Sequence, residues 1–172
     1  MDTLLKRLQE EIASAVDGLS AEEWDRHPPG KWCAGEVLEH LYLTYTGTIK
    51  GFSRVIESRK LATTPASWRQ RGRKLVVLGL SYLPSGREAP AFARPKGLPR
   101  EKVLAEIEGQ IAEMDRMIGQ CEKRFGAGKP LLDHPILGPL SGEQWRKFHL
   151  VHGRLHLEQI RRLRLKGGAF RA

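Results

Sequence analysis

The chain has 172 residues, of which 40% are hydrophobic and 28% are charged, and its formal net charge is +9 at pH 7. These values are typical of one soluble globular domain, residues 1–172, and its two cysteines are too few for a disulfide framework. The absence of a run of 18 apolar residues excludes a membrane-spanning helix, and the amphipathic first segment is unlike a signal peptide, so we expect a cytoplasmic protein that makes no membrane contact.

The first third of the chain predicts two helices with a short helical turn between them. Apolar residues recur at helical spacing over residues 4–16. Ser20 and Glu23 have the spacing of a capping box, which predicts a short helical turn after Ser20. A long amphipathic helix is then predicted for residues 34–59, with His40 in its second turn.

The middle of the chain is harder to assign. Residues 60–72 are polar and basic and are predicted to be a loop. Residues 74–83 are apolar on all sides and too short for periodicity to distinguish a strand from a helix. Because helices surround this segment in the sequence, we assign it as a helix. Residues 84–99 contain four prolines and are predicted to be a surface connection.

The last third predicts two more long helices. Residues 99–124 carry a clear apolar stripe, and residues 126–140 form the last loop. A helix of about six or seven turns follows over residues 141–166, where Ser141 and Gln144 have capping-box spacing. Four long amphipathic segments joined by loops predict an all-α four-helix bundle with short extra helical segments.

The last predicted helix carries histidines where core apolar residues normally stand. His152 and His156 are four residues apart, so both imidazoles lie on one face and can reach the same metal ion. His149 and His152, three apart, could do the same. His149 and His156 are separated by about 10 Å of helix rise and cannot easily share an ion. The alternative is a set of half-buried histidines with hydrogen-bonding partners in the core.

A metal needs more than two ligands, and His40 is the natural candidate for the third. It lies on or beside the apolar stripe of the helix over residues 34–59. Two facing helices can bring it to the His152 and His156 pair. A core histidine with no metal is the alternative for His40 as well.

Two motifs make the chain similar to a known family. Residues 31–32, Lys-Trp, and residues 35–41, Gly-Glu-Val-Leu-Glu-His-Leu, resemble the motif at the start of the second helix in the DinB-like (DinB/YfiT) superfamily. His152, His156 and Gln159 resemble the His-x-x-x-His-x-x-Gln signature on the last long helix of that family.

A third segment extends the resemblance. Residues 133–140, Asp-His-Pro-Ile-Leu-Gly-Pro-Leu, followed by Trp145, are similar to the lead-in to the last helix in a bacterial subgroup of the superfamily. The resemblance spans residues 4–163. It implies a four-helix bundle with an up-down-down-up arrangement.

The resemblance also implies a metal site and a class of chemistry. It maps the ligands of a divalent metal to His40, His152 and His156, and it leaves His149 nearby, lining or supporting the pocket. Zinc is the expected metal, with nickel or iron as alternatives. Characterised relatives often transfer bacillithiol, mycothiol or glutathione to electrophiles. The resemblance therefore implies a metal-dependent thiol S-transferase, or a hydrolase-like enzyme, that acts on a small molecule and uses a low-molecular-weight thiol.

The neighbours of the three histidines suggest further roles. Three imidazoles leave a coordination position open, which is the catalytic arrangement, but residues 152–156 lack the glutamate of a His-Glu-x-x-His protease. Glu36, one turn before His40, could be a hydrogen-bond acceptor, a general base, a fourth ligand or a solvated residue. Gln159 could orient a ligand through a hydrogen bond. Tyr45 and Trp145 are expected in the core or the pocket wall.

The positive charge is concentrated in two places. No acid occurs between Glu57 and Glu88, and that stretch and the tail after Glu158 hold twelve bases: Arg59, Lys60, Arg69, Arg71, Arg73, Lys74, Arg87, Arg161, Arg162, Arg164, Lys166 and Arg171. These bases could bind phosphates, attract an anionic thiol or keep the protein soluble.

Other functional classes remain open. No helix-turn-helix or other nucleic-acid motif is present, which argues against a nucleic-acid partner. A non-catalytic binding module of the same fold is the main competing interpretation. Homodimers are common among the relatives, so the resemblance allows a homodimer, although nothing in the sequence itself demonstrates one.

Overall fold

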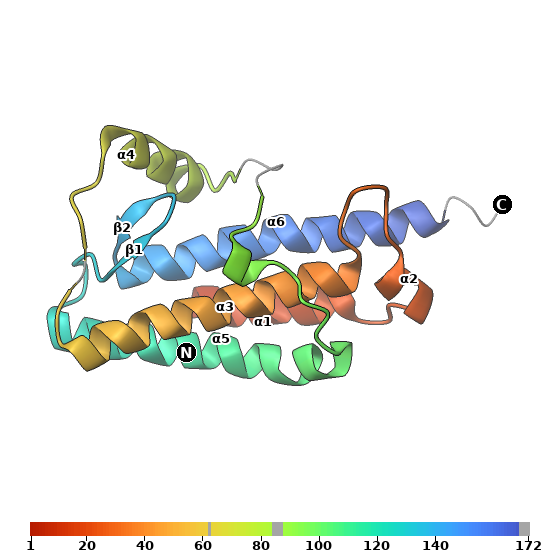
Figure 1. The fold of residues 1–172 in the computed structure, drawn as a ribbon, viewed down its shortest axis with the longest axis horizontal. Coiled ribbons are helices and arrows are strands. Elements are labelled where there is room, and N and C mark those ends of the chain that lie inside the picture. Colours follow the sequence, from red (N-terminus) through yellow and green to blue (C-terminus); the bar gives the residue numbers. More distant parts are fainter. Residues whose placement is uncertain (62, 84–87, 169–172) are drawn as a thin grey trace.

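Four long helices form the body of the structure (Figure 1), a computed structural model that describes residues 1–61, 63–83 and 88–168. They are α1 (Thr3–Val16), α3 (Ala34–Ser58), α5 (Arg100–Phe125) and α6 (Gly142–Gly168). Helices α1 and α6 run in one direction, and α3 and α5 run in the opposite direction (Figure 1). The predicted all-α bundle and its up-down-down-up arrangement are therefore confirmed.

The predicted capping boxes start two of the helices. At α2 (Ala21–Asp25), the Ser20 hydroxyl accepts from the Glu23 backbone N–H at 3.3 Å, and the Glu23 carboxylate accepts from the Ser20 N–H at 2.8 Å. Ser141 and Gln144 make the same pair of bonds, at 3.3 and 3.1 Å, at the start of α6. In each case two backbone donors that have no intrahelical partner are satisfied.

The predicted loop over residues 60–72 is wrong at its end, because α4 (Trp68–Lys74) begins inside it. Ser67 accepts from the Gln70 N–H at 3.3 Å, and the Gln70 side-chain oxygen accepts from the Ser67 N–H at 2.9 Å. This Ser-x-x-Gln spacing equals that at Ser141, so the sequence does contain a start signal for α4.

The predicted helix over residues 74–83 is correct only in part. A π-helical turn, η1 (Leu75–Gly79), continues from α4, and the helical conformation ends there. Ser81 has a φ of 51°, which is incompatible with a continuing right-handed helix. Only Val77 and Leu78 of η1 are buried, so the segment lies at the surface although it is apolar on all sides.

The predicted loop over residues 126–140 contains a small β-hairpin. Strands β1 (Leu132–His134) and β2 (Gly138–Leu140) are antiparallel, and Leu132 pairs with Leu140. Gly138 has a φ of +73°, a conformation that glycine adopts readily, and it closes the three-residue turn. The hairpin lies beside the first turns of α6 (Figure 1).

The proline-rich connection over residues 84–99 is not at the surface throughout. Residues 84–87 lie outside the described residues. Within the rest, a short 3₁₀ turn, η2 (Ala91–Ala93), packs against α3, and Ala93 is 1% exposed. A Cβ atom on Gly47 of α3 would lie 2.9 Å from the Phe92 ring, so the missing side chain permits this close approach.

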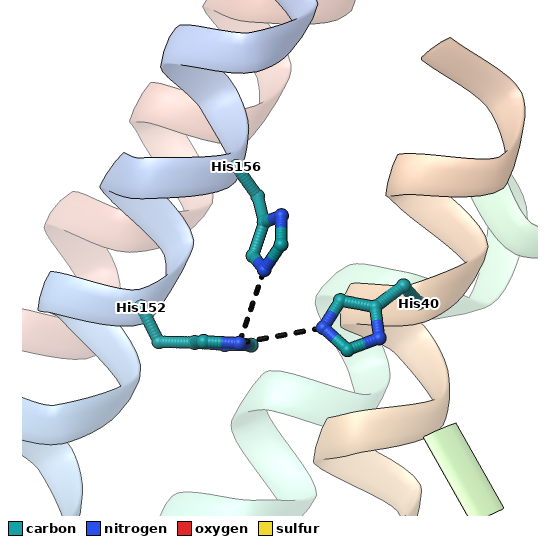
Figure 2. A group of neighbouring side chains, drawn as sticks. All are labelled: His40, His152 and His156. Atoms are coloured by element: carbon teal, nitrogen blue, oxygen red, sulfur yellow. Dashed lines mark hydrogen bonds between the residues drawn. The ribbon is translucent and has the colours of Figure 1, made fainter. Parts of the chain in front are cut away.

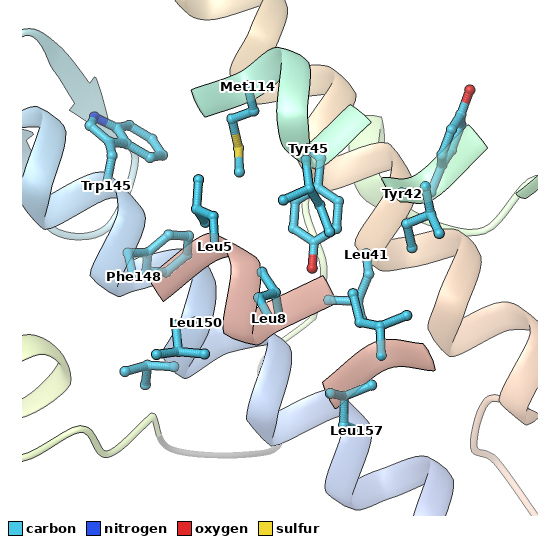
Figure 3. Packing of buried hydrophobic residues seen from close by; sticks show 14 of the residues in the cluster. Leu5, Leu8, Leu41, Tyr42, Tyr45, Met114, Trp145, Phe148, Leu150 and Leu157 are labelled. Atoms are coloured by element: carbon cyan, nitrogen blue, oxygen red, sulfur yellow. The ribbon is translucent and has the colours of Figure 1, made fainter. Parts of the chain in front are cut away.

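The core lies between the four long helices. Leu5 and Leu8 of α1 point toward Tyr45 of α3, Met114 of α5 and the apolar side chains of α6 (Figure 3). Leu5, Leu8, Tyr45 and Met114 are each 0% exposed. Among the described residues, none of the helices combines the length and the apolar character that crossing a bilayer requires.

Contacts along α6 fix its position against its neighbours. The Arg146 guanidinium donates to both carboxylate oxygens of Glu122 at 2.9 Å and to Asp115 at 2.7 Å, which joins α6 to α5. On the other side, Gly153 faces Leu8 of α1, and a Cβ atom there would lie 2.4 Å from a Leu8 methyl group. These contacts determine which residues of α6 face α3.

Candidate metal centre

Three imidazoles meet between α3 and α6 (Figure 2). His40 comes from the N-terminal half of α3, and His152 and His156 lie one turn apart on α6. His152 Nε2 is 3.3 Å from His40 Nε2 and 3.1 Å from His156 Nε2. All three residues are buried, with 4–9% of their surface exposed. The fold therefore brings together the three histidines that the sequence indicated.

Hydrogen bonds made by Nδ1 fix the tautomers of two of these rings, His40 and His156. His40 Nδ1 is 2.7 Å from the backbone carbonyl oxygen of Ala93, and His156 Nδ1 is 2.9 Å from Oε1 of Gln159. Both oxygens can only accept, so each Nδ1 carries a proton and donates it. A neutral imidazole has one N–H, and the Nε2 atoms of His40 and His156 therefore present lone pairs to His152.

This arrangement fits a divalent metal better than hydrogen bonding alone. His152 Nε2 can donate one proton at most, so it satisfies only one of the two lone pairs that face it. A cation would satisfy all three nitrogens. Tetrahedral nitrogen ligands at about 2.0–2.1 Å from zinc lie about 3.4 Å apart, which is close to the observed spacings. Three histidine ligands suit zinc, nickel or iron and leave a coordination position open.

Burial keeps the three imidazoles neutral. Burial, and to a smaller extent the neighbouring His40, lowers the pKa of His156 to about 4. Burial also places the pKa of His152 well below its ordinary value, with His156 and His40 acting in the same direction. The pKa of His40 is lowered by burial, against a smaller opposing effect of the Ala93 carbonyl. Their lone pairs are therefore available to a metal at neutral pH.

A cavity of about 410 Å³ lies beside the three imidazoles, which form part of its wall. Helices α3 and α6, η2 and the hairpin enclose it, and most of its lining is apolar. Large apolar side chains in the wall include Trp32, Phe92, Leu132, Trp145, Phe148 and Leu155. Arg54 also lines the cavity, is exposed, and forms no ion pair with any residue that the structure describes.

Comparison with known proteins places the chain in a family. Residues 4–160 match the DinB superfamily. The chain belongs to the DinB superfamily. No curated protein and no solved structure matches it. Membership in the DinB superfamily agrees with the helical bundle and with the group of three histidines.

Two of the predicted neighbours line the cavity of this DinB-superfamily chain. Gln159 is in the wall and accepts from His156 Nδ1, as the expected orienting contact requires. Trp145 is in the wall too, and its ring N–H donates to the Leu132 carbonyl at 3.1 Å. Trp145 thereby connects α6 to the hairpin that covers the cavity.

Tyr45 and His149 lie deeper, in the core. Both are 0% exposed, and neither is among the residues that line the cavity. The His149 ring stacks on Trp145, with centroids 5.7 Å apart, so it supports the wall from behind. Both ring nitrogens of His149, the Tyr45 hydroxyl and His152 Nδ1 are buried without a hydrogen-bond partner in the described part of the chain.

Glu36 does not reach the three histidines. Its carboxylate accepts from the Cys33 backbone N–H at 2.9 Å and lies 2.9 Å from His27 Nε2. Glu36 is the third residue of α3, where a carboxylate satisfies a free backbone donor. Of the roles left open for Glu36, this contact is that of a hydrogen-bond acceptor at the start of α3, and Glu36 is not among the residues that line the cavity.

His134 is a cavity residue that the sequence did not identify. Its Nδ1 accepts from the backbone N–H groups of Ile136 and Leu137 at 3.1 and 3.2 Å, so its proton is on Nε2. Burial lowers its pKa to about 4. A lone histidine in a predicted loop has no spacing that indicates a site, although His134 lies in the segment over residues 133–140 that carries part of the family resemblance.

Proposed function

We propose that this protein is a divalent-metal-dependent enzyme that transfers a low-molecular-weight thiol to an electrophilic small molecule. The observation that carries the proposal is that three imidazole nitrogens converge at the wall of a cavity of about 410 Å³. Hydrogen bonds at Nδ1 leave lone pairs on the Nε2 atoms of two of these rings, His40 and His156. His40, His152 and His156 would hold the metal. A divalent cation makes a thiol or water that it binds more acidic, which supplies a nucleophile near neutral pH.

The residues around the metal ligands would orient the reactants. The Ala93 carbonyl and Gln159 hold two of the ligand rings in place. The apolar wall would bind the hydrophobic part of the electrophile and keep water away from it. Arg54, exposed at the wall, would pair with a carboxylate of the thiol.

The reaction would form a carbon–sulfur bond and break two bonds, the one from carbon to its leaving group and the S–H bond of the thiol. The thiol sulfur forms a bond to the electrophilic carbon, the leaving group departs with its electron pair, and the thiol proton passes to solvent. No oxidant or reductant is required.

Consumption of a thiol tests the proposal. We expect zinc-loaded protein to accelerate the reaction of cysteine, glutathione or coenzyme A with 1-chloro-2,4-dinitrobenzene. The acceleration should disappear with EDTA, return with added zinc and be absent in His152→Ala. His27→Ala is the matched control, because His27 is exposed and outside the cavity wall. Metal-loaded protein that accelerates none of these reactions, or acceleration that EDTA leaves unchanged, would contradict the proposal and favour a non-catalytic module.

A further inference from the structure

A second hollow, of about 390 Å³, lies where α4 and η1 pack over the turn of the hairpin. Its inner surface is apolar and is formed by Val76, Val77, Ile136 and Leu137. Val77 is 4% exposed and Leu137 is 1% exposed, so both lie at the base of the hollow. An open apolar surface of this kind is a candidate ligand site.

Two arginines line the same hollow. Arg69 and Arg73 are exposed, and neither forms an ion pair with a residue in the described ranges. Helix α4 holds four bases and no acid in seven residues, and the sequence contains no acid between Glu57 and Glu88. Like charges at this density repel one another, and an anion bound among them would relieve that repulsion.

The fourth base of α4 is already engaged elsewhere. The Lys74 ammonium donates to the Pro139 carbonyl at 2.6 Å, which ties α4 to strand β2. Arg69 and Arg73 are thus the cations of α4 that line the hollow. Trp68 completes its rim, with 77% of its surface exposed and the Arg69 guanidinium carbon 5.2 Å from its ring centroid. An aromatic face beside a cation can bind the apolar part of a ligand next to its charge.

We propose that this hollow binds a small amphipathic anion. The apolar body of the ligand would contact Val76, Val77 and Leu137, and its carboxylate, sulfonate or phosphate would pair with Arg69 and Arg73. The site is distinct from the three histidines and needs no metal. Such a ligand also explains why the stretch between Glu57 and Glu88, which has many bases and no acid, exposes apolar side chains.

The two hollows share part of their walls. Leu83, Ile136 and Leu137 line both the histidine cavity and the hollow under α4. A ligand under α4 would therefore contact the same hairpin turn that encloses the histidine cavity.

Calorimetry with octanoate on the full chain tests the site. We expect octanoate to bind at least tenfold more tightly than octylamine, which has the wrong charge, and than acetate, which has no apolar body. Arg69→Gln/Arg73→Gln should weaken octanoate binding at least tenfold. Lys60→Gln/Arg71→Gln is the matched control, since it removes the same charge from residues outside the hollow, and it should change binding less than twofold.

Methyl NMR spectra locate the bound octanoate. We expect shifts at Val76 and Val77 in wild type and in Arg54→Gln, because Arg54 belongs to the histidine cavity. Octylamine that binds as tightly as octanoate would overturn the proposal, and so would shifts confined to Leu155. Binding to phosphatidylglycerol vesicles without binding of free octanoate would also overturn it and assign the basic segment to a lipid surface.

Discussion

The imidazoles of His40, His152 and His156 differ in the hydrogen-bond partner of their Nδ1 atoms. His40 donates to a backbone carbonyl, His156 donates to the Gln159 side chain, and His152 Nδ1 has no partner among the described residues. An acceptor for the outer N–H orients a histidine ligand and makes it a better donor. The contact of His156 is the one that a single substitution can remove.

Gln159→Leu should weaken the binding of zinc by about 10- to 100-fold, because His156 loses the acceptor that orients it. Gln159→Glu keeps an acceptor at the same position and should retain the affinity of the wild type. A competition titration with a chromophoric chelator measures both variants. Equal affinities for Gln159→Leu and wild type would show that this hydrogen bond does not position the ligand.

The sequence predicts some residue roles better than others. The spacing of His152 and His156 is sufficient to place both rings on one face, because a helix has a fixed period. The hydrogen bond from His40 to the Ala93 carbonyl could not be predicted, since every residue has a backbone carbonyl. The sequence left several roles open for Glu36, because an apolar period does not show whether a carboxylate in the first turn of a helix faces a site or accepts from a free backbone donor.

For a helix or a strand, its length decides whether the sequence predicts it. The four long helices repeat their apolar pattern over many turns, and this pattern is predictable. Helix α4 and the hairpin β1–β2 are too short to show a period and depend on contacts with other elements, such as the Lys74 bond to Pro139. The part of the cavity wall that the hairpin supplies was therefore not predictable.

The close packing of α6 on α1 depends on Gly153. Gly153→Ala should destabilise the fold by about 1–3 kcal/mol, because the new methyl group would meet the fully buried Leu8. Gly109→Ala in α5 is the matched control: nothing lies within 4 Å of its Cβ position, and alanine should stabilise that helix by about 0.5–1 kcal/mol. Urea denaturation measures both free energies of unfolding. A Gly153→Ala protein as stable as wild type would show that α1 and α6 separate easily.

For the molecule as a whole, buried histidines make stability depend on pH. Burial lowers the pKa of His134 and of His156 to about 4 and that of His149 to about 3. In the unfolded chain, histidines take up protons near pH 6.5. Between pH 4 and pH 6.5 the unfolded state therefore binds more protons than the folded state. The contribution of these histidines to the free energy of unfolding is complete above about pH 6.5 and is lost as the pH falls toward 4.

The free energy of unfolding of metal-free protein should therefore decrease from pH 7 to pH 5. His134 alone accounts for about 3 kcal/mol over its full titration, since one pKa unit corresponds to about 1.4 kcal/mol. Denaturation in EDTA at several pH values measures the slope, and His134→Gln should reduce it. A free energy that is constant over this range would mean that the folded protein accommodates charged histidines.

The proposed chemistry depends on a metal between α3 and α6, and elemental analysis tests for this metal most directly. Protein purified without added metal should contain about one divalent transition-metal ion per chain. His152→Ala, checked for retained helicity by circular dichroism, should contain almost none, and His27→Ala should match the wild type. Wild-type protein that neither contains nor takes up a divalent ion, or His152→Ala protein that keeps a full equivalent, would contradict the assignment of His40, His152 and His156 as metal ligands.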